Sequence, residues 1–304
     1  MMMSDVIYHP EQRFQCNGLH IAADSFGDKR NPPVLLIMGL ATQLVHWDEA
    51  FCRKLAAQGY WVIRFDNRDI GRSDYLHSKP TPGLLNMATH HYFKAPINAP
   101  YLLDDMANDA VALLDSLNIP AAHIIGVSMG GMIAQIMAIQ HPDRVLSLTS
   151  IMSSPGDKKL MKPKLKVAFT VLRPRSKSQE QYIKQALAMW KVLHGKHFPF
   201  EEERMRNMIL TALQRGVSAS GIMRQLGAIM VAPDRTPQLQ QLDIPSLVVH
   251  GDADPLVPVI NGIKTAEAIP DSELKIIKGM GHTIPVSIWD ELIDSFNAVA
   301  RKSS

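Results

Sequence analysis

The residue of this sequence best placed for chemistry is a serine that stands between two glycines. Ser128 occupies the centre of a G-x-S-x-G pattern, with Gly126 before it and Gly130 after it. The pattern follows an apolar run and precedes residues at helical spacing, so it predicts a sharp turn from a buried strand into a helix. Such a turn, a nucleophile elbow, holds the hydroxyl out at the end of a sheet. The glycines let neighbouring elements approach without Cβ clashes.

A serine hydroxyl is a weak nucleophile near neutral pH, so it needs a base that is itself oriented by a third group. His282 is the candidate base, because it follows an apolar run that ends at Ile277 and lies in a loop whose glycines allow a close approach to the elbow. The candidate acids are Asp252 and Asp254, which follow the apolar run ending at His250. Both aspartates could instead cap the helix expected after them. The sequence therefore predicts a Ser-His-Asp triad whose acid is one of these two residues.

Backbone donors near the serine would complete the site. Acyl transfer passes through a tetrahedral intermediate with a negative oxygen, and each donor aimed at that oxygen is worth about 10²- to 10³-fold in rate. We expect one donor to be the N–H of Met129, the residue after the serine. The other is expected to be the N–H of Leu40, which follows the apolar run 34–38. Gly39 permits the turn between that run and Leu40.

The elements that must position these residues alternate along the chain. Asn17-Gly18 suits a type I′ turn and predicts an N-terminal hairpin of two antiparallel strands. The apolar runs that follow are separated by helical patterns, which predicts a parallel sheet with right-handed crossovers. The strands expected after the hairpin are residues 34–38, 61–65, 122–127, 145–151, 246–250 and 274–277.

Two stretches between these elements are more than simple connections. Residues 66–74 are dense in charged side chains, and we interpret them as a hydrogen-bonded structural loop rather than as ligands for a substrate. Residues 76–101 contain four prolines and predict a long irregular segment over the mouth of the site. The second stretch would thus cover the site.

The alternation of strands and helices stops at about residue 153 and resumes at about residue 237. The residues between have a helical pattern, which predicts a helical cap over 153–236, inserted between two parts of an α/β core at 1–152 and 237–304. Methionines of this cap could line an apolar pocket, although helix packing is the favoured explanation for Met161, Met189, Met205, Met208, Met223 and Met230. A solvated face is favoured over an anion-binding role for the cap's lysines Lys158, Lys159, Lys162, Lys164 and Lys166.

Composition narrows the classes of function. The chain has 304 residues and a formal net charge of +3, which is too small to indicate a nucleic-acid partner. Cys16 and Cys52 lie far apart without metal-ligand spacing, so they predict reduced thiols and a cytoplasmic protein. The sequence shows neither a signal-peptide pattern nor an apolar run that would give stable membrane insertion. The predicted chemistry needs no metal and no organic cofactor, and the oligomeric state is not readable.

Over essentially its whole length, the sequence resembles the α/β-hydrolase superfamily, whose triad follows in the order serine, acid, histidine. It further resembles a bacterial branch of carboxylesterases of the aclacinomycin methylesterase type in Met38-Gly39-Leu40, Trp47 and Arg64-Phe65-Asp66-Asn67-Arg68-Asp69-Ile70-Gly71-Arg72-Ser73. The resemblance implies a mostly parallel eight-stranded sheet flanked by helices, with an inserted cap. It also favours Asp254 as the acid, because Gly251 and Asp254 match the superfamily's acid loop. Met38 is a departure, since many relatives have histidine there.

The resemblance implies a serine esterase that cleaves carboxylic esters through an acyl-enzyme intermediate, with a small-molecule ester as its partner. Other reactions on the same triad stay open, among them cleavage of a thioester, lactone, amide or carbon–carbon bond and cofactor-free perhydrolysis. A receptor that keeps the fold and binds a small ligand without turnover is the non-enzymatic alternative. A serine at the elbow argues against dehalogenase or epoxide hydrolase chemistry, which in this fold resembles attack by a carboxylate.

Overall fold

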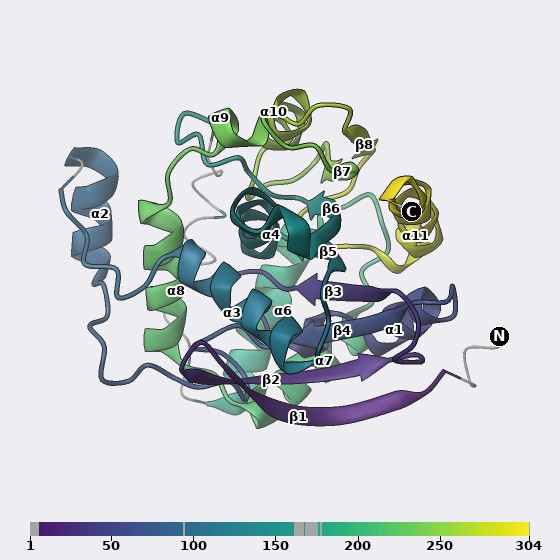
Figure 1. Ribbon diagram of the computed structural model, residues 1–304. Helices are drawn as coiled ribbons and strands as arrows, with labels where there is room; N and C mark the ends of the chain where they lie inside the picture. The colour runs from purple at the N-terminus through teal and green to yellow at the C-terminus, as the bar shows by residue number, and fades with distance from the viewer. Residues whose placement is uncertain (1–5, 94, 161–166, 168–175, 177, 304) are drawn as a thin grey trace.

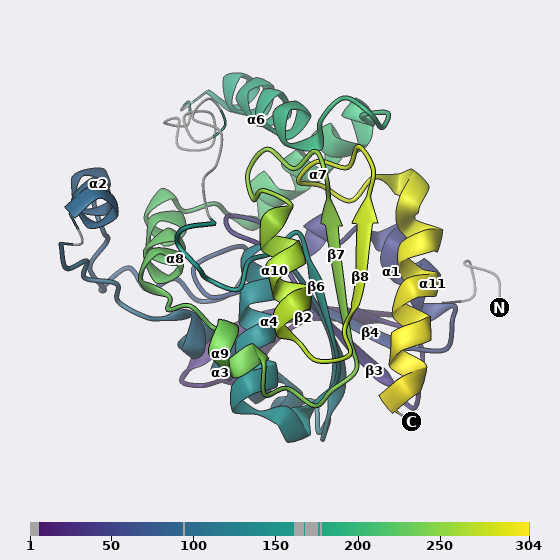
Figure 2. The ribbon, with the colours of Figure 1, turned by 90° about the horizontal axis from the view of Figure 1, so that it is seen from above.

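A single sheet with helices on both faces organises the molecule (Figures 1 and 2). The computed structural model describes residues 6–93, 95–160, 167, 176 and 178–303. These residues form an eight-stranded sheet in the order β1-β2-β4-β3-β5-β6-β7-β8. The strands are β1 (Tyr8–Cys16), β2 (Leu19–Phe26), β3 (Pro33–Ile37), β4 (Trp61–Phe65), β5 (Ala122–Val127), β6 (Val145–Ile151), β7 (Ser246–Gly251) and β8 (Glu273–Ile277).

Antiparallel pairing is confined to the edge of the sheet that contains β1 and β2. β1 pairs with β2 and β2 pairs with β4 in antiparallel fashion, whereas all the other neighbouring strands pair in parallel. Asn17 and Gly18 join β1 to β2 with φ angles of 47° and 77°, the positive values that a type I′ turn requires. The predicted hairpin and the predicted mostly parallel sheet are therefore confirmed.

The central strands are buried because each of their faces packs on helices. In β3, Leu35 and Ile37 belong to the core shared with α3 (Leu103–Ser116) and α4 (Met129–Gln140). Val34 and Leu36 belong to the core shared with α1 (Glu49–Ala56) and α11 (Trp289–Ala300). Successive side chains of a strand point to opposite faces, so a strand covered on both sides reads as a continuous apolar run. This is why the parallel strands could be predicted from their composition.

Ten α-helices are assigned within the described residues. They are α1 (Glu49–Ala56), α2 (Leu84–Phe93), α3 (Leu103–Ser116), α4 (Met129–Gln140), α6 (Gln179–His194), α7 (Glu202–Arg215), α8 (Ala219–Val231), α9 (Thr236–Leu239), α10 (Ile260–Ala268) and α11 (Trp289–Ala300). Short 3₁₀ helices add η2 (Leu44–His46), η3 (Pro142–Arg144), η4 (Val286–Ile288) and η5 (Arg301–Ser303). None of the helices in these ranges is long and apolar enough to cross a membrane.

Helices α6, α7 and α8 lie between β6 and β7 in the chain, inside the range predicted as a cap. Figure 2 shows α6 and α7 beyond the carboxyl ends of β7 and β8. The division of the chain at residues 153 and 236 stays a prediction. Four residues of the predicted cap lie outside the described residues: Met161, Lys162, Lys164 and Lys166.

The expectation that residues 76–101 are irregular throughout is wrong, because they contain helix α2. This helix is stabilised by packing on α8, beside which it lies in both views (Figures 1 and 2). Met87 is buried, and His90 Nε2 lies 3.3 Å from the carbonyl oxygen of Met230 on α8. The prolines on either side of the helix hid its short pattern, and its tertiary partner could not be read from the sequence. A role for this segment at the mouth of the site stays a prediction.

Candidate active site

Ser128 is the one residue of the turn between β5 and α4. Its φ and ψ angles are 55° and −118°. A residue with a side chain pays a strain energy at positive φ, on the order of 1–3 kcal/mol, and keeps such a conformation only where its surroundings enforce it. Here the Ser128 N–H donates to the carbonyl of Ile151 at 2.9 Å, and the Ser153 hydroxyl donates to the carbonyl of Ser128 at 2.8 Å. The strand beside the turn thus holds the serine in place.

The glycines around Ser128 are required by close backbone contacts. A Cβ atom at Gly126 would lie 2.2 Å from the carbonyl oxygen of Gly130. A Cβ atom at Gly130 would lie 2.1 Å from the carbonyl oxygen of Ile37, the last residue of β3. The first contact lets α4 turn back sharply on β5. The second brings the end of β3, and the loop that follows it, against the serine.

His282 lies between the serine and an aspartate. Its Nε2 atom is 3.0 Å from Ser128 Oγ, and its Nδ1 atom is 2.6 Å from Asp254 Oδ2. A carboxylate only accepts hydrogen bonds, so Nδ1 carries the proton and Nε2 is left to accept the proton of the serine. The structure therefore brings together the three side chains predicted from the sequence, in the geometry that general-base activation of a serine needs. Their catalytic roles stay a prediction.

Asp254 is bound by its own loop and kept ionised by two histidines. Its Oδ1 atom accepts from the N–H groups of Leu256 at 2.8 Å and Val257 at 2.9 Å. Burial alone would raise the pKa of Asp254, but the charge and hydrogen bonds of His282 and His250 hold that pKa below its usual value. The carboxyl group is thus ionised when His282 takes up a proton.

Asp252, the other candidate acid, lies apart from His282. It is exposed, and its Oδ1 atom accepts from the N–H of Gly279 at 2.6 Å. This bond ties the loop after β7 to the loop after β8. The structure gives Asp252 a place in a turn, as expected if Asp254 is the acid.

The glycines of the histidine loop serve a contact that the sequence did not indicate. We expected Gly279 and Gly281 to let the loop approach the elbow. Instead, a Cβ atom at Gly281 would lie 2.2 Å from the carbonyl oxygen of Leu193, and one at Gly279 would lie 2.2 Å from the ring of His197. The N–H of His282 also donates to the carbonyl of Leu193 at 2.6 Å. The close approach is therefore to the end of α6 and the residues just after it.

The loop after β3 lies directly beside the serine. A Cβ atom at Gly39 would be 3.2 Å from Ser128 Cβ and 3.8 Å from Ser128 Oγ. Among the described residues, nothing accepts a hydrogen bond from the N–H of Leu40. Met129 opens α4, and N–H groups of a helix's first turn have no carbonyl partner within the helix. The two N–H groups predicted to bind an oxyanion are thus free to do so, and this role stays a prediction.

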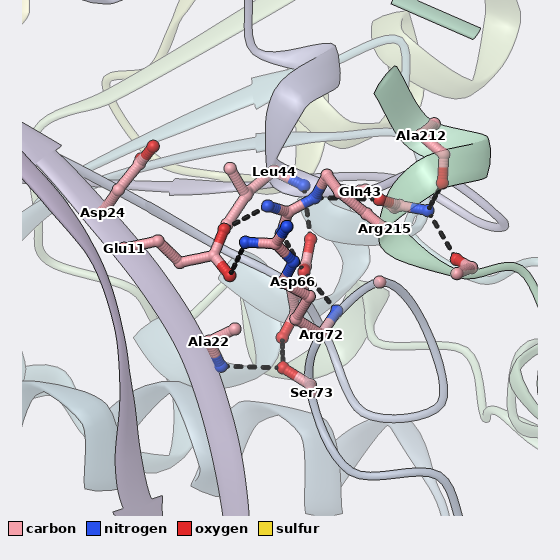
Figure 3. Close-up of polar contacts among 12 residues, drawn as sticks. Glu11, Ala22, Asp24, Gln43, Leu44, Asp66, Arg72, Ser73, Ala212 and Arg215 are labelled. Carbon is pink, nitrogen blue, oxygen red and sulfur yellow. Dashed lines mark hydrogen bonds and ion pairs between the residues drawn. The ribbon is translucent and has the colours of Figure 1, made fainter. Parts of the chain in front are cut away.

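The charged loop 66–74 supports the loop after β3. Asp66 accepts at Oδ1 from the N–H of Leu44 at 2.7 Å and at Oδ2 from the N–H of Arg72 at 2.8 Å (Figure 3). The side-chain amide of Asn67 donates to the carbonyl of Met38 at 3.0 Å. These contacts agree with a hydrogen-bonded structural loop.

Sequence reasoning missed two residues, in α7 and α8, that reach this region. Gln225 of α8 is fully buried and accepts at Oε1 from the N–H of Ala41 at 3.1 Å. Arg215, the last residue of α7, donates to Asp66 Oδ2 at 2.5 Å and also contacts Glu11 (Figure 3). Burial would lower the pKa of Arg215, but the carboxylates of Asp66 and Glu11 raise it, so the guanidinium stays charged. No local pattern marks either residue, because each is a single polar side chain in a helix.

Within the described residues, no group of three or more histidine, cysteine, aspartate or glutamate side chains is placed to hold a metal ion.

Known proteins share both the sequence pattern and the fold. The alpha/beta hydrolase fold family matches residues 32–171. The chain is 27% identical to a rhodomycin D methylesterase of Streptomyces peucetius over 303 residues, which cover 93% of this chain and 95% of that protein. It is 25% identical to a 3-oxoadipate enol-lactonase of Acinetobacter baylyi, over 90% of each chain.

Solved structures agree on the fold. A meta-cleavage product hydrolase from Pseudomonas fluorescens superposes with a TM-score of 0.74 at 17% identity, over 96% of this chain and 98% of that chain. A thermophilic esterase from Thermogutta terrifontis gives a TM-score of 0.69 at 21% identity, over 97% and 99% of the two chains.

The sheet, the elbow and these matches agree on the class: the chain has the α/β-hydrolase fold and resembles the proteins of that superfamily. Within that superfamily, the predicted resemblance to the methylesterase branch is also confirmed, because the rhodomycin D methylesterases of two Streptomyces strains match nearly the whole chain.

Proposed function

We propose that Ser128 attacks the carbonyl carbon of a carboxylic ester, with His282 as its base. We propose that Asp254 orients His282 and stabilises the positive charge that His282 acquires. The chain is a carboxylic ester hydrolase, in keeping with its superfamily and its methylesterase relatives. The observation that carries the assignment of residues is a continuous chain of two contacts: Ser128 Oγ to His282 Nε2 at 3.0 Å, and His282 Nδ1 to Asp254 Oδ2 at 2.6 Å.

The reaction follows from the positions of these atoms. His282 Nε2 takes the hydroxyl proton as Ser128 Oγ bonds to the carbonyl carbon, and the electrons of the C=O bond move onto its oxygen. When that bond reforms, the alcohol oxygen leaves and takes the proton from Nε2. A water molecule then attacks the acyl-enzyme, His282 accepts one of its protons, and Ser128 Oγ leaves with that proton as the acid is released.

Asp254 stabilises the positive charge that His282 carries in both halves of this reaction. Its carboxylate is already bound by two backbone N–H groups, so it needs no rearrangement as the charge develops. The N–H groups of Leu40 and Met129 are proposed to bind the carbonyl oxygen when it becomes negative. Both lie in segments that contact Ser128 or continue from it.

The substrate class that we propose is a methyl ester of a small organic acid. Its support is the similarity to rhodomycin D methylesterases over 93% of this chain. The similarity to an enol-lactonase makes a lactone the second substrate to test, because ring opening of a lactone uses the same attack on a carbonyl.

We further propose that the enzyme works in the cytoplasm. Cys16 and Cys52 are buried free thiols. Burial raises the pKa of Cys16 to about 11 and that of Cys52 to about 12, so both stay protonated and unreactive. This is consistent with a protein built for a reducing compartment.

A substrate panel tests the proposal. Wild type and Ser128→Ala would be assayed on p-nitrophenyl esters of short and medium acyl chains, on methyl esters, on a thioester and on a lactone. We expect the wild type to cleave esters, and we expect kcat to fall by at least about 10³-fold in Ser128→Ala. No turnover of any ester, or full activity of Ser128→Ala, would contradict the proposal. Tight binding of a panel member with negligible turnover would favour the receptor alternative.

A further inference from the structure

The loop after β3 depends on the cap for its shape. Residues 38–43 lie between β3 and η2 and have no strand or helix of their own. Ala41 within them has a φ angle of 62°, a conformation that a residue with a Cβ atom adopts only when its neighbours hold it there. The hydroxyl of Thr42 donates to the carbonyl of Gly39 at 2.7 Å, which closes a local turn. The other supports come from distant parts of the chain.

Gln225 of α8 provides the support at Ala41. Its Oε1 atom accepts from the N–H of Ala41 at 3.1 Å, and its Nε2 group donates to the carbonyl of Arg68 at 2.8 Å. An N–H can only donate and a carbonyl can only accept, so these two partners fix the orientation of the amide. The side chain is fully buried, and Gln225 therefore bridges the loop after β3 to the charged loop after β4.

The helix that carries Gln225 is firmly attached to the core. The neighbouring Arg224 makes a two-pronged ion pair with Asp69, at 2.6 and 2.8 Å, and also donates to the hydroxyl of Thr81 at 2.9 Å. A Cβ atom at Gly221 would lie 2.3 Å from the carbonyl oxygen of Asp69. Because α8 packs this closely, Gln225 is a fixed support and not a side chain that follows the loop.

A second part of the cap holds the far end of the same loop. The side-chain amide of Gln43 donates to the carbonyls of Ala212 and Gly216 at 2.8 and 2.7 Å, and accepts from Arg215 Nε at 3.0 Å (Figure 3). Asp66, which pairs with Arg215, also accepts from the N–H of Leu44. Leu40 thus lies in a loop whose next residues are fixed at Ala41, Gln43 and Leu44.

We propose that Gln225 is a positioning residue for ester hydrolysis: it holds Ala41 so that the N–H of Leu40 points at the carbonyl oxygen that turns negative. This inference rests on the proposed function and adds a cap residue to it. A donor aimed at the oxyanion stabilises the transition state more than the bound ester. Gln225 acts through the loop and contacts neither the reacting carbonyl nor Ser128, so its loss lowers kcat and leaves KM nearly unchanged.

The test compares two protein variants, each of which lacks hydrogen bonds made by α8. Gln225→Met keeps the volume of the side chain and removes both hydrogen bonds. Thr81→Val removes a hydrogen bond between α8 and the core without touching the loop after β3, and serves as the matched control. On a p-nitrophenyl ester we expect kcat of Gln225→Met to fall about 10- to 100-fold, since a misplaced donor costs less than a deleted one, while KM stays within about 3-fold. Thr81→Val keeps the kcat of the wild type.

Binding of a trifluoromethyl ketone separates positioning from mere loss of structure. This inhibitor forms a tetrahedral adduct with a reactive serine and needs the oxyanion donors, so its affinity should fall in Gln225→Met by the same factor as kcat. A variant that only lost stability would keep the affinity of its folded fraction. Gln225→Asn, which retains an amide one methylene shorter, is the second variant and should change kcat in the same direction if Gln225→Met does not fold.

The outcomes distinguish this inference from the proposed function. If Ser128→Ala is inactive while Gln225→Met or Gln225→Asn has the kcat and inhibitor affinity of the wild type, the positioning role is overturned and the ester hydrolase proposal stands. If Ser128→Ala keeps its activity, the proposed nucleophile is wrong. A rise in KM with unchanged kcat would also overturn the inference, because it would place Gln225 in ground-state binding.

Discussion

Two sides of the candidate site are held in different ways. The histidine side, residues 251–257 and 278–283, fixes Asp254 and His282 largely through backbone groups close to them in the chain and through the carbonyl of Leu193. The side that carries the proposed oxyanion donor Leu40, residues 39–47 and 66–74, is here called the oxyanion side. It is held by the buried side chains of Gln225 in α8 and Arg215 in α7. On the histidine side, backbone groups hold the side chains that are proposed to react. On the oxyanion side, side chains hold the backbone N–H group that is proposed to bind the oxyanion.

Because of this difference, mutations on the two sides are expected to have different effects on rate and stability. On the histidine side, a change in a reacting or charge-stabilising side chain should lower kcat strongly and have a smaller effect on stability. On the oxyanion side, the proposed donors are main-chain N–H groups that substitution cannot remove, so a mutation must act through the residues that hold them. Those residues carry buried charge and buried amides, and their loss should lower stability as well as rate.

The largest effect in this comparison is expected from Asp254→Asn. An asparagine amide can donate to His282 Nδ1, which would leave the proton on Nε2 and block its role as a base. We expect kcat on a p-nitrophenyl ester to fall about 10³- to 10⁴-fold. KM and the midpoint of urea unfolding near neutral pH would be measured beside it. A large fall in stability with only a modest fall in kcat would contradict the expectation that mutations on the histidine side act mainly on the rate.

Arg215→Met is expected to act on both rate and stability. It leaves the buried carboxylate of Asp66 without its guanidinium partner, and breaking a buried ion pair from one side costs about 3–5 kcal/mol. We expect the free energy of unfolding, from urea titration, to fall in that range and kcat to fall about 10-fold as the loop after β3 loosens. The double variant Asp66→Asn with Arg215→Met removes the unpaired charge, and it should recover part of the stability but not the rate. Stability equal to that of the wild type in the single variant would contradict this account.

Acid unfolding gives a test on the histidine side. The pKa of Asp254 is lower in the folded protein than in the unfolded chain, where it is about 3.9. Its stabilising contribution is therefore fully present above that unfolded value and is lost as pH falls toward the lower folded value. The difference in unfolding free energy between wild type and Asp254→Asn should accordingly shrink below about pH 4. A difference that grows as the solution is acidified would mean that the carboxyl group is destabilised in the fold.

Asp252→Asn should have the smallest effect. It weakens one hydrogen bond, to the N–H of Gly279, at an exposed position. We expect a loss of about 1 kcal/mol or less in unfolding free energy and a kcat within about 3-fold of the wild type. A fall in kcat as large as that of Asp254→Asn would assign the acid to the wrong aspartate.

The same contrast explains how much could be predicted from the sequence. The elbow and the loops that carry Asp254 and His282 have local patterns of glycine and polar residues at the ends of apolar runs, so their positions could be predicted. The support of the oxyanion side joins residues that are 184 positions apart for Ala41 and Gln225, and 149 apart for Asp66 and Arg215. A lone glutamine or arginine in a helix has no spacing that indicates such a partner. Helix α2 and the glycine contacts of the histidine loop were missed for the same reason, since both depend on packing against the cap.

Labelling with a fluorophosphonate is the sharpest test of Ser128 as the activated nucleophile. The reagent phosphonylates a serine only where a base has activated its hydroxyl. The account predicts that one equivalent is incorporated, that peptide mapping finds it on Ser128, and that ester turnover falls in proportion to the fraction labelled. Loss of turnover with Ser128 unmodified, or full turnover with Ser128 completely modified, would contradict it.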